Sequence, residues 1–280
     1  MALDINVNVQ NFRENYMAEE SGIFVFDLET TGLPLQPSEW NYYPYTYLEK
    51  YDVSRIVSIA WEVYNMMGQK ISECFKIVKT TQPNTDEASK IHGITLERME
   101  KDGIDLAEII PMLFEDLKRC TVVVAHNIPF HATVLSSEMH RGGYNNIVEE
   151  LQKKFLYCTM THGREKMRPK KFPTLEELHV TLFNRKGRST DVHQTNEDAS
   201  ITARIFFKMV PKKKVHVTGY KAEEYTTRSI PSKYGLRTKM KKTQTYMQDV
   251  EIADPTAAKI RKPRKRTVSH RDDYPSTDEY

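Results

Sequence analysis

The sequence predicts an α/β sandwich, in which a mixed five-stranded sheet carries helices on both faces. Short apolar runs with strand-like composition fill the first part of the chain, and a tight turn separates two of them. Later apolar runs are separated by stretches with helical periodicity. Strands joined by tight turns pair antiparallel, whereas strands that return after a helix run parallel. We therefore expect three antiparallel strands, followed by parallel ones, with functional groups at the strand ends.

The first strand is expected at residues 22–28 and leads directly into two acidic residues. Four apolar residues precede Asp27 and Glu29, and the run closes at Gly32 and Pro34. Side chains alternate along a strand, so the two carboxylates lie on one face. Neighbouring carboxylates repel, and Mg²⁺ or Mn²⁺ with oxygen ligands relieves that repulsion. A solvated strand end is the alternative, but the apolar run places the pair at the rim of a core.

An aromatic insertion at residues 34–52 follows. Three prolines within it favour a loop, and most of its aromatic residues are tyrosines. Such rings beside a carboxylate pair can stack on nucleobases. The alternative is a loop packed on itself and anchored by tyrosines, and we favour this alternative slightly.

The other elements follow from periodicity and end signals. Further strands are expected at residues 56–64, 71–78, 121–125 and 155–158. Helices are expected at residues 85–92, 105–120, 130–140, 159–167, 174–179 and 196–209, the last capped by Thr195 or Asn196.

Bulk composition divides the 280 residues into an arm (1–20), a body (21–210) and a tail (211–280). No apolar run has transmembrane length and no signal-peptide pattern is present, so we expect an intracellular protein without membrane attachment. Three widely spaced cysteines suit buried, reduced thiols.

Charge is distributed unevenly along the chain. The tail holds 17 Lys and Arg against 9 Asp and Glu, whereas residues 1–210 hold 24 against 29. Basic clusters at residues 211–215 and 261–266 suit nuclear import or phosphate contacts, and a solvated, partly disordered tail is compatible with both. We therefore expect the cytoplasm or the nucleus.

Two further segments belong beside the carboxylate pair. Residues 124–131 leave a strand and enter a helix, and residues 191–199 place His193 five positions before Asp198. On one continuous helix these two side chains would point about 140° apart. If both serve one site, His193 lies in the loop before the helix and Asp198 in its first turn. Residues 185–190 form a polar lead-in to this loop.

Taken in order, four segments resemble the motifs of the DEDDh exonuclease family. They are residues 26–32 (Phe-Asp-Leu-Glu-Thr-Thr-Gly), 91–95 (Ile-His-Gly-Ile-Thr), 125–130 (Ala-His-Asn-x-x-Phe) and 193–199 (His-x₄-Asp-Ala). A Leu-rich segment at residues 174–178 adds to a similarity that covers residues 22–209.

This resemblance implies a ribonuclease-H-like three-layer fold and a 3′→5′ exonuclease that uses two divalent ions, Mg²⁺ or Mn²⁺. Asp27 would bridge both ions, Glu29 and Asp198 would complete the shell of the first, and His193 would take the proton of water. Single-stranded nucleic acid or its 3′ ends would be the substrate. The family positions that hold the terminal nucleotide correspond to Thr30, Thr31, His92 and Phe130. His126 is expected to shape a turn.

One position departs from the family pattern. The second motif normally ends in Asp, and here it ends in His131. Imidazole is a poor ligand for Mg²⁺, so the second ion is expected to be weakened. Three outcomes stay open. A nitrogen-tolerant ion such as Mn²⁺ replaces Mg²⁺, a nearby carboxylate such as Glu138 substitutes, or the chain is a degenerate exonuclease that binds nucleic acid without significant cleavage.

Overall fold

The computed structural model describes residues 22–38, 41–167, 171–210, 215–218, 220–221 and 247–250. The expected arm at residues 1–20 and the basic cluster at 261–266 lie outside the described residues, as does all of the cluster at 211–215 except Val215.

A single main sheet carries the five expected strands. Its order is β3-β2-β1-β4-β5, with one short strand, β7, added at the β5 edge. The pairs β1–β2 and β2–β3 are antiparallel, and β1–β4 and β4–β5 are parallel, as the connections predict. The bounds are β1 Gly22–Thr30, β2 Ile56–Asn65, β3 Lys70–Ile77, β4 Cys120–Ala125, β5 Phe155–Cys158 and β7 Tyr220–Lys221.

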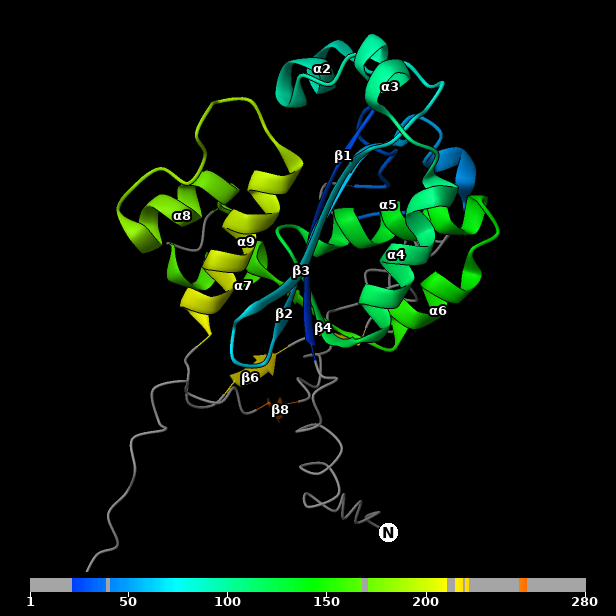
Figure 1. Ribbon diagram of the computed structural model, residues 1–280. Coiled ribbons are helices and arrows are strands. Elements are labelled where there is room, and N and C mark those ends of the chain that lie inside the picture. The colour runs from blue at the N-terminus through cyan, green and yellow to red at the C-terminus, as the bar shows by residue number, and fades with distance from the viewer. Residues whose placement is uncertain are drawn as a thin grey trace, which may run out of the picture.

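Helices cover both faces of this sheet, which confirms the predicted three-layer architecture (Figure 1). They are α2 Asp86–His92, α3 Leu96–Asp102, α4 Leu106–Lys118, α5 Ile128–Arg141, α6 Asn145–Gln152, α7 Thr159–Lys166, α8 Leu175–Phe183 and α9 Thr195–Met209. A second, two-stranded sheet pairs β6 (Val215–Thr218) with β8 (Met247–Val250). Within the described part of the chain, no helix is both long and apolar enough to cross a bilayer.

The alternation of β1 explains the two layers. Phe24, Phe26 and Leu28 belong to the core beneath α4, α5 and α6, whereas Ile23 and Val25 belong to the core beneath α9. These apolar side chains are removed from water on both faces of the sheet. Their burial is the main stabilising contribution to the fold. Odd-numbered residues at the end of β1 therefore lie on the α9 side.

Three local expectations need correction. Two short helices, α3 and α6, were not expected from the sequence, and α3 buries one residue, Met99. The cap of α9 was expected at Thr195 or Asn196. The cap residue is Gln194, which makes no side-chain cap bond, and the Thr195 hydroxyl hydrogen-bonds Ser58 on β2.

The described part of the aromatic insertion, residues 34–38 and 41–52, is a packed loop with one 3₁₀ turn, η1 Leu48–Lys50. Tyr42 and Tyr51 are buried, and Tyr43 stacks on Tyr47. The Tyr51 hydroxyl donates to the backbone oxygen of Tyr43. These contacts support the self-packed loop that the sequence analysis favoured.

Candidate metal and catalytic site

The two acidic residues of β1 face α9. Asp27 and Glu29 have the same parity as Val25, whose side chain lies in the α9 core. Glu29 pairs in register with Ser58, and Ser58 hydrogen-bonds Thr195 at the start of α9. This bond holds the first turn of α9, which contains Asp198, over the end of β1.

Glu29, His193 and Asp198 converge on one point. Each offers a ligand atom, and these atoms all lie within 4.8 Å of one another. The Nδ1 atom of His193 lies 3.5 Å from a carboxylate oxygen of each acid. His193 precedes α9 and Asp198 sits in its first turn, as their spacing predicts. The backbone amide of His193 donates to the oxygen of Ile91 at 2.8 Å, which fixes the loop against α2.

Asp27 lies deeper, outside the set of three converging atoms. Its side chain is almost fully buried, and burial raises its pKa well above the ordinary aspartate value. The negative charges of Asp198 and Glu29 raise it further, and the Arg188 charge opposes them. Burial likewise raises the pKa of Asp198, against the opposing effect of Arg188. The site thus concentrates negative charge in a poorly solvated place, which a cation relieves.

Arg188 is a component of the site that the sequence analysis did not identify. Its guanidinium binds both oxygens of Asp198, with Nε–Oδ1 at 2.6 Å and Nη2–Oδ2 at 2.8 Å. The same Nη2 lies 3.3 Å from Nδ1 of His193. The available signal was an arginine within the polar lead-in, five residues before His193.

His131, the residue that departs from the family pattern, contacts Asp27. Its Nε2 atom lies 3.4 Å from Oδ1 of Asp27. Burial lowers the pKa of His131 to about 3, so the imidazole is neutral at physiological pH. Its Nδ1 atom is buried without a hydrogen-bond partner in the described part of the chain.

Glu138, the carboxylate considered as a substitute, pairs with two arginines. It lies seven residues after His131 on α5, almost fully buried, and accepts from Arg55 Nε at 2.6 Å and Arg55 Nη2 at 3.2 Å. Arg141 Nε donates to it at 3.3 Å, and Arg141 also pairs with Asp52 of the insertion. The carboxylate therefore braces the insertion against α5, and we expect these arginine contacts to keep it from a metal ion.

The residues expected to hold a terminal nucleotide surround the end of β1. The Thr30 hydroxyl donates to the backbone oxygen of Gly32, and that of Thr31 donates to Val53. His92 Nδ1 accepts from the amide of Ile94, and its Nε2 lies 3.3 Å from the oxygen of Thr30. Phe130 is partly buried with its ring against His131. Their role with a nucleotide stays a prediction.

His126 hydrogen-bonds two other segments at the end of β4, and its expected role in shaping the turn stays a prediction. Its Nδ1 contacts the Thr159 hydroxyl at 3.0 Å and its Nε2 contacts the Pro173 oxygen at 3.1 Å. The next residue, Asn127, adopts a left-handed conformation with φ of 73° and starts α5. Asparagine tolerates this conformation better than most residues.

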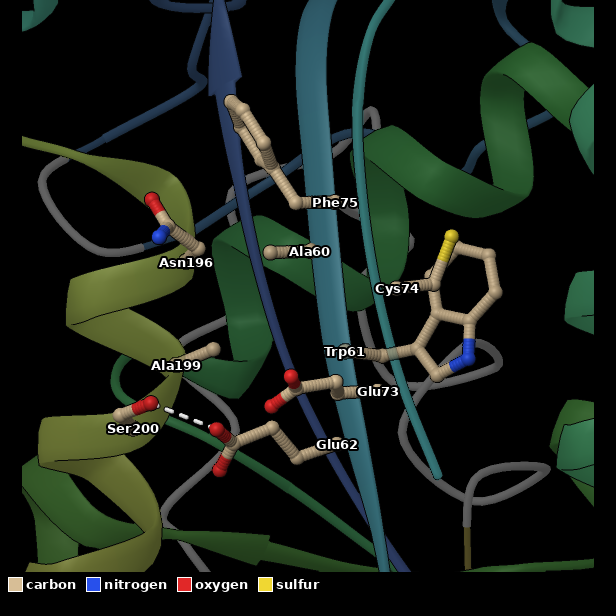
Figure 2. A pocket seen from close by; sticks show the side chains of 9 residues that line it. All are labelled: Ala60, Trp61, Glu62, Glu73, Cys74, Phe75, Asn196, Ala199 and Ser200. Atoms are coloured by element: carbon tan, nitrogen blue, oxygen red, sulfur yellow. Dashed lines mark hydrogen bonds between the residues drawn. The ribbon is translucent and has the colours of Figure 1, made fainter.

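A pocket of about 280 Å³ lies between α9 and the β2–β3 pair (Figure 2). Glu62 projects into it and accepts from Ser200 and from Lys70. None of the predicted catalytic residues lines this pocket. It shares only the α9 helix with the carboxylate cluster.

An α/β sandwich with clustered carboxylates at the end of its first strand is typical of nucleases. Residues 24–206 match the family model described as exonuclease, of the ribonuclease T type. This range is more than half of the chain, and the protein therefore belongs to this DnaQ-like exonuclease family.

One relative by sequence is the PolC-type DNA polymerase III of Caldanaerobacter subterraneus subsp. tengcongensis. It is 28% identical over 204 residues, which are 71% of this chain and 12% of the relative. The chain thus spans about an eighth of that polymerase's length.

Solved structures share the fold. Exonuclease I of E. coli in complex with a dT13 oligonucleotide is 15% identical, with a TM-score of 0.51, over 66% of this chain and 40% of that chain. The zinc-bound form of an E. coli Exonuclease I complex with single-stranded DNA is 16% identical, with a TM-score of 0.50, over 66% of this chain and 39% of that chain.

Proposed function

We propose that this protein is a divalent-metal-dependent 3′→5′ exonuclease that releases nucleoside 5′-monophosphates from single-stranded nucleic acid. The observation that carries the proposal is the convergence of Glu29, His193 and Asp198, supplied by two distant segments of the chain. Membership of the exonuclease family and a fold shared with Exonuclease I complexed with DNA support the same interpretation.

The residues present suit a hard divalent cation. Asp27, Glu29 and Asp198 offer carboxylate oxygens, the ligands that Mg²⁺ and Mn²⁺ prefer. Their mutual repulsion and burial, expressed in the raised pKa of Asp27, disfavour three uncompensated charges. Ions held by these three residues would supply the positive charge that activates water and stabilises the leaving oxygen.

His193 is the general base of the proposed reaction. A water oxygen bonds to phosphorus while the bond from phosphorus to the 3′ oxygen of the preceding nucleotide breaks. His193 takes the proton of the water, and the departing 3′ oxygen receives a proton from solvent. The histidine side chain is about one third exposed and its loop is fixed through Ile91, so it is both accessible and held in place.

The residues around the end of β1 position the terminal nucleotide. The Phe130 ring offers a stacking face, and His92 joins α2 to the backbone of Thr30 at the strand end. Thr30 and Thr31 set the shape of the turn through their own hydroxyl bonds. A substrate with a free 3′ end would be read through its backbone and last base.

A second candidate function is nucleic-acid binding without significant cleavage. His131 in place of a carboxylate, and the guanidinium of Arg188 on Asp198, favour it. A 5′-labelled single-stranded oligonucleotide, incubated in Mg²⁺ and in Mn²⁺, separates the two functions. The exonuclease predicts progressive shortening, release of 5′-monophosphates and protection by a 3′-phosphate block.

Variants test the assigned roles in the same assay. His193→Asn is expected to lose about 10²–10⁴-fold in rate, the usual contribution of a general base. His140→Asn is the matched control, because His140 bonds Asn145 at 2.8 Å, outside the cluster. Oligonucleotide binding with no shortening in either metal would establish the binding function and overturn the enzyme.

A further inference from the structure

We propose that Arg188 is a built-in competing cation: its guanidinium and a divalent ion exclude each other from Asp198, so Arg188 weakens metal binding at this site. The inference rests on the proposed function insofar as that function assigns the metal to these carboxylates. It concerns the affinity of the site for metal rather than the reaction.

The contact engages both carboxylate oxygens of Asp198. Both carboxylate oxygens accept from Arg188, at 2.6 and 2.8 Å, in the two-pronged geometry that makes such pairs strong. The Asp198 side chain is only 3% exposed and that of Arg188 is 13% exposed. A cation that binds Asp198 therefore competes with the guanidinium for these two buried oxygens.

Arg188 also occupies the nitrogen of His193 that faces the carboxylates. Nη2 lies 3.3 Å from Nδ1, the same atom that lies 3.5 Å from Glu29 and Asp198. A guanidinium only donates, so a hydrogen bond between these two atoms runs from Nη2 to Nδ1. Arg188 thus contacts both Asp198, a proposed metal ligand, and His193, the proposed general base.

Carboxylates on α8 and α9 hold the backbone of the loop that carries Arg188. Glu176 on α8 accepts from the backbone amides of Gly187 and Arg188, at 3.0 and 3.2 Å. Glu197 on α9 accepts from the amide of Ser189 at 2.7 Å. Anchors on both sides of Arg188 place the guanidinium between two helices.

Gly187 permits this close approach of the loop. A Cβ atom at this position would lie 2.9 Å from Cγ of His179, closer than real Cβ contacts allow. Because the backbone is held in this way, the position of Arg188 is a property of the loop and not of its side chain alone.

Charge arithmetic gives the consequence. The three carboxylates carry a formal charge of −3, and the guanidinium reduces it to −2. A divalent ion therefore meets a weaker negative field while Arg188 stays on Asp198. The affinity for divalent ions should therefore rise when Arg188 loses its charge.

The test is Mn²⁺ binding by titration calorimetry on the full chain without nucleic acid. Arg188→Gln is expected to bind Mn²⁺ roughly tenfold or more tightly than the wild type, within the usual range of coupling between competing ligands. Arg188→Lys keeps a charge but loses the two-pronged contact, and an intermediate affinity is expected. Arg185→Gln removes an exposed charge from the same loop and should leave the affinity unchanged.

Thermal unfolding distinguishes competition from a merely structural role. Arg188→Gln should melt below the wild type in EDTA and gain more than the wild type on addition of Mn²⁺. Glu176→Ala leaves the carboxylate cluster intact and should tighten Mn²⁺ binding by a smaller factor.

Equal or weaker Mn²⁺ binding by folded Arg188→Gln and Arg188→Lys would overturn the proposal. Because the measurement contains no substrate, failure of the nuclease assay leaves it standing. Conversely, if the protein is an active nuclease and its metal affinity does not change when Arg188 is substituted, this inference is wrong but the proposed function stands.

Discussion

The imidazole Nε2 of His131 lies 3.4 Å from Oδ1 of Asp27, and both side chains are almost completely buried. The His131 ring is neutral, and its Nδ1 atom has no hydrogen-bond partner in the described part of the chain. It lies beside Asp27, the most deeply buried of the carboxylates proposed to bind metal. This pair limits how much negative charge the site offers on its inner side.

His131→Asp is expected to raise the Mg²⁺-dependent rate by about 10–100-fold, the usual effect of supporting residues at metal sites. The added carboxylate supplies hard oxygen ligands where the ring supplies one nitrogen. Initial rates in Mg²⁺ and in Mn²⁺ measure the gain, which should be larger in Mg²⁺.

His131→Asn is the matched control, since it has the size of aspartate without its charge. It should not raise the Mg²⁺ rate. A wild type that is already fast in Mg²⁺ and gains nothing from His131→Asp would contradict this account of the position.

Asp27→Asn should make the protein less sensitive to pH in EDTA. The folded pKa of Asp27 is raised, so its contribution to stability is fully present below the unfolded value of 3.8 and is lost as pH rises through the folded pKa. Asparagine does not ionise, so the variant does not lose this stability as the pH rises. Melting temperatures between about pH 4 and pH 8 should fall less steeply for the variant than for the wild type.

Asp191→Asn is the control for this series. Asp191 is fully exposed and weakly paired with Lys186, so its removal should leave the pH dependence as it is. Activity should be lost in Asp27→Asn and kept in Asp191→Asn. A parallel pH dependence of the wild type and Asp27→Asn would show that the buried Asp27 carboxylate does not destabilise the fold.

Much of this site follows from local patterns in the sequence. The alternation along β1 fixes the face of Asp27 and Glu29, and the five-residue spacing places His193 before α9 and Asp198 within it. Both conclusions need only the geometry of one element. Short-range rules of this kind transfer directly from sequence to structure.

Arg188 and Glu138 show where such rules end. Both are charged side chains whose partners lie on other segments: Asp198 for one, Arg55 for the other. The position of an arginine in the sequence does not determine which carboxylate it pairs with. The pairing depends on how loops pack against helices, and residue spacing does not predict that packing.

Glu138→Gln is expected to lower the free energy of unfolding by about 2 kcal/mol, because it leaves the Arg55 charge without its buried partner. The Arg55 side chain is 30% exposed, so solvent relieves part of the loss. Chemical denaturation measures the change. Mn²⁺ affinity should stay at the wild-type value, since Glu138 braces the insertion and does not bind metal.

Glu150→Gln is a suitable comparison, because Glu150 also pairs with two cations, Lys153 and Lys154, at the end of α6. It should also leave Mn²⁺ affinity unchanged. Loss of Mn²⁺ binding in Glu138→Gln alone would restore Glu138 as a metal ligand.

The basic cluster at residues 261–266 provides the last prediction, on nucleic-acid affinity. Its five Lys and Arg residues are replaced by Gln, which keeps the chain length and β6–β8 pairing. If the cluster binds phosphates, the slope of log affinity against log salt becomes shallower by roughly 0.7 for each phosphate of a single strand that is no longer neutralised. Fluorescence anisotropy with a single-stranded oligonucleotide across a salt series gives the slope. Replacing five exposed lysines of the body by Gln controls for net charge; they are Lys79, Lys101, Lys118, Lys153 and Lys208. An unchanged slope in the cluster variant would assign phosphate binding to other parts of the chain, and nuclear import or a solvated tail would remain the explanation for the cluster.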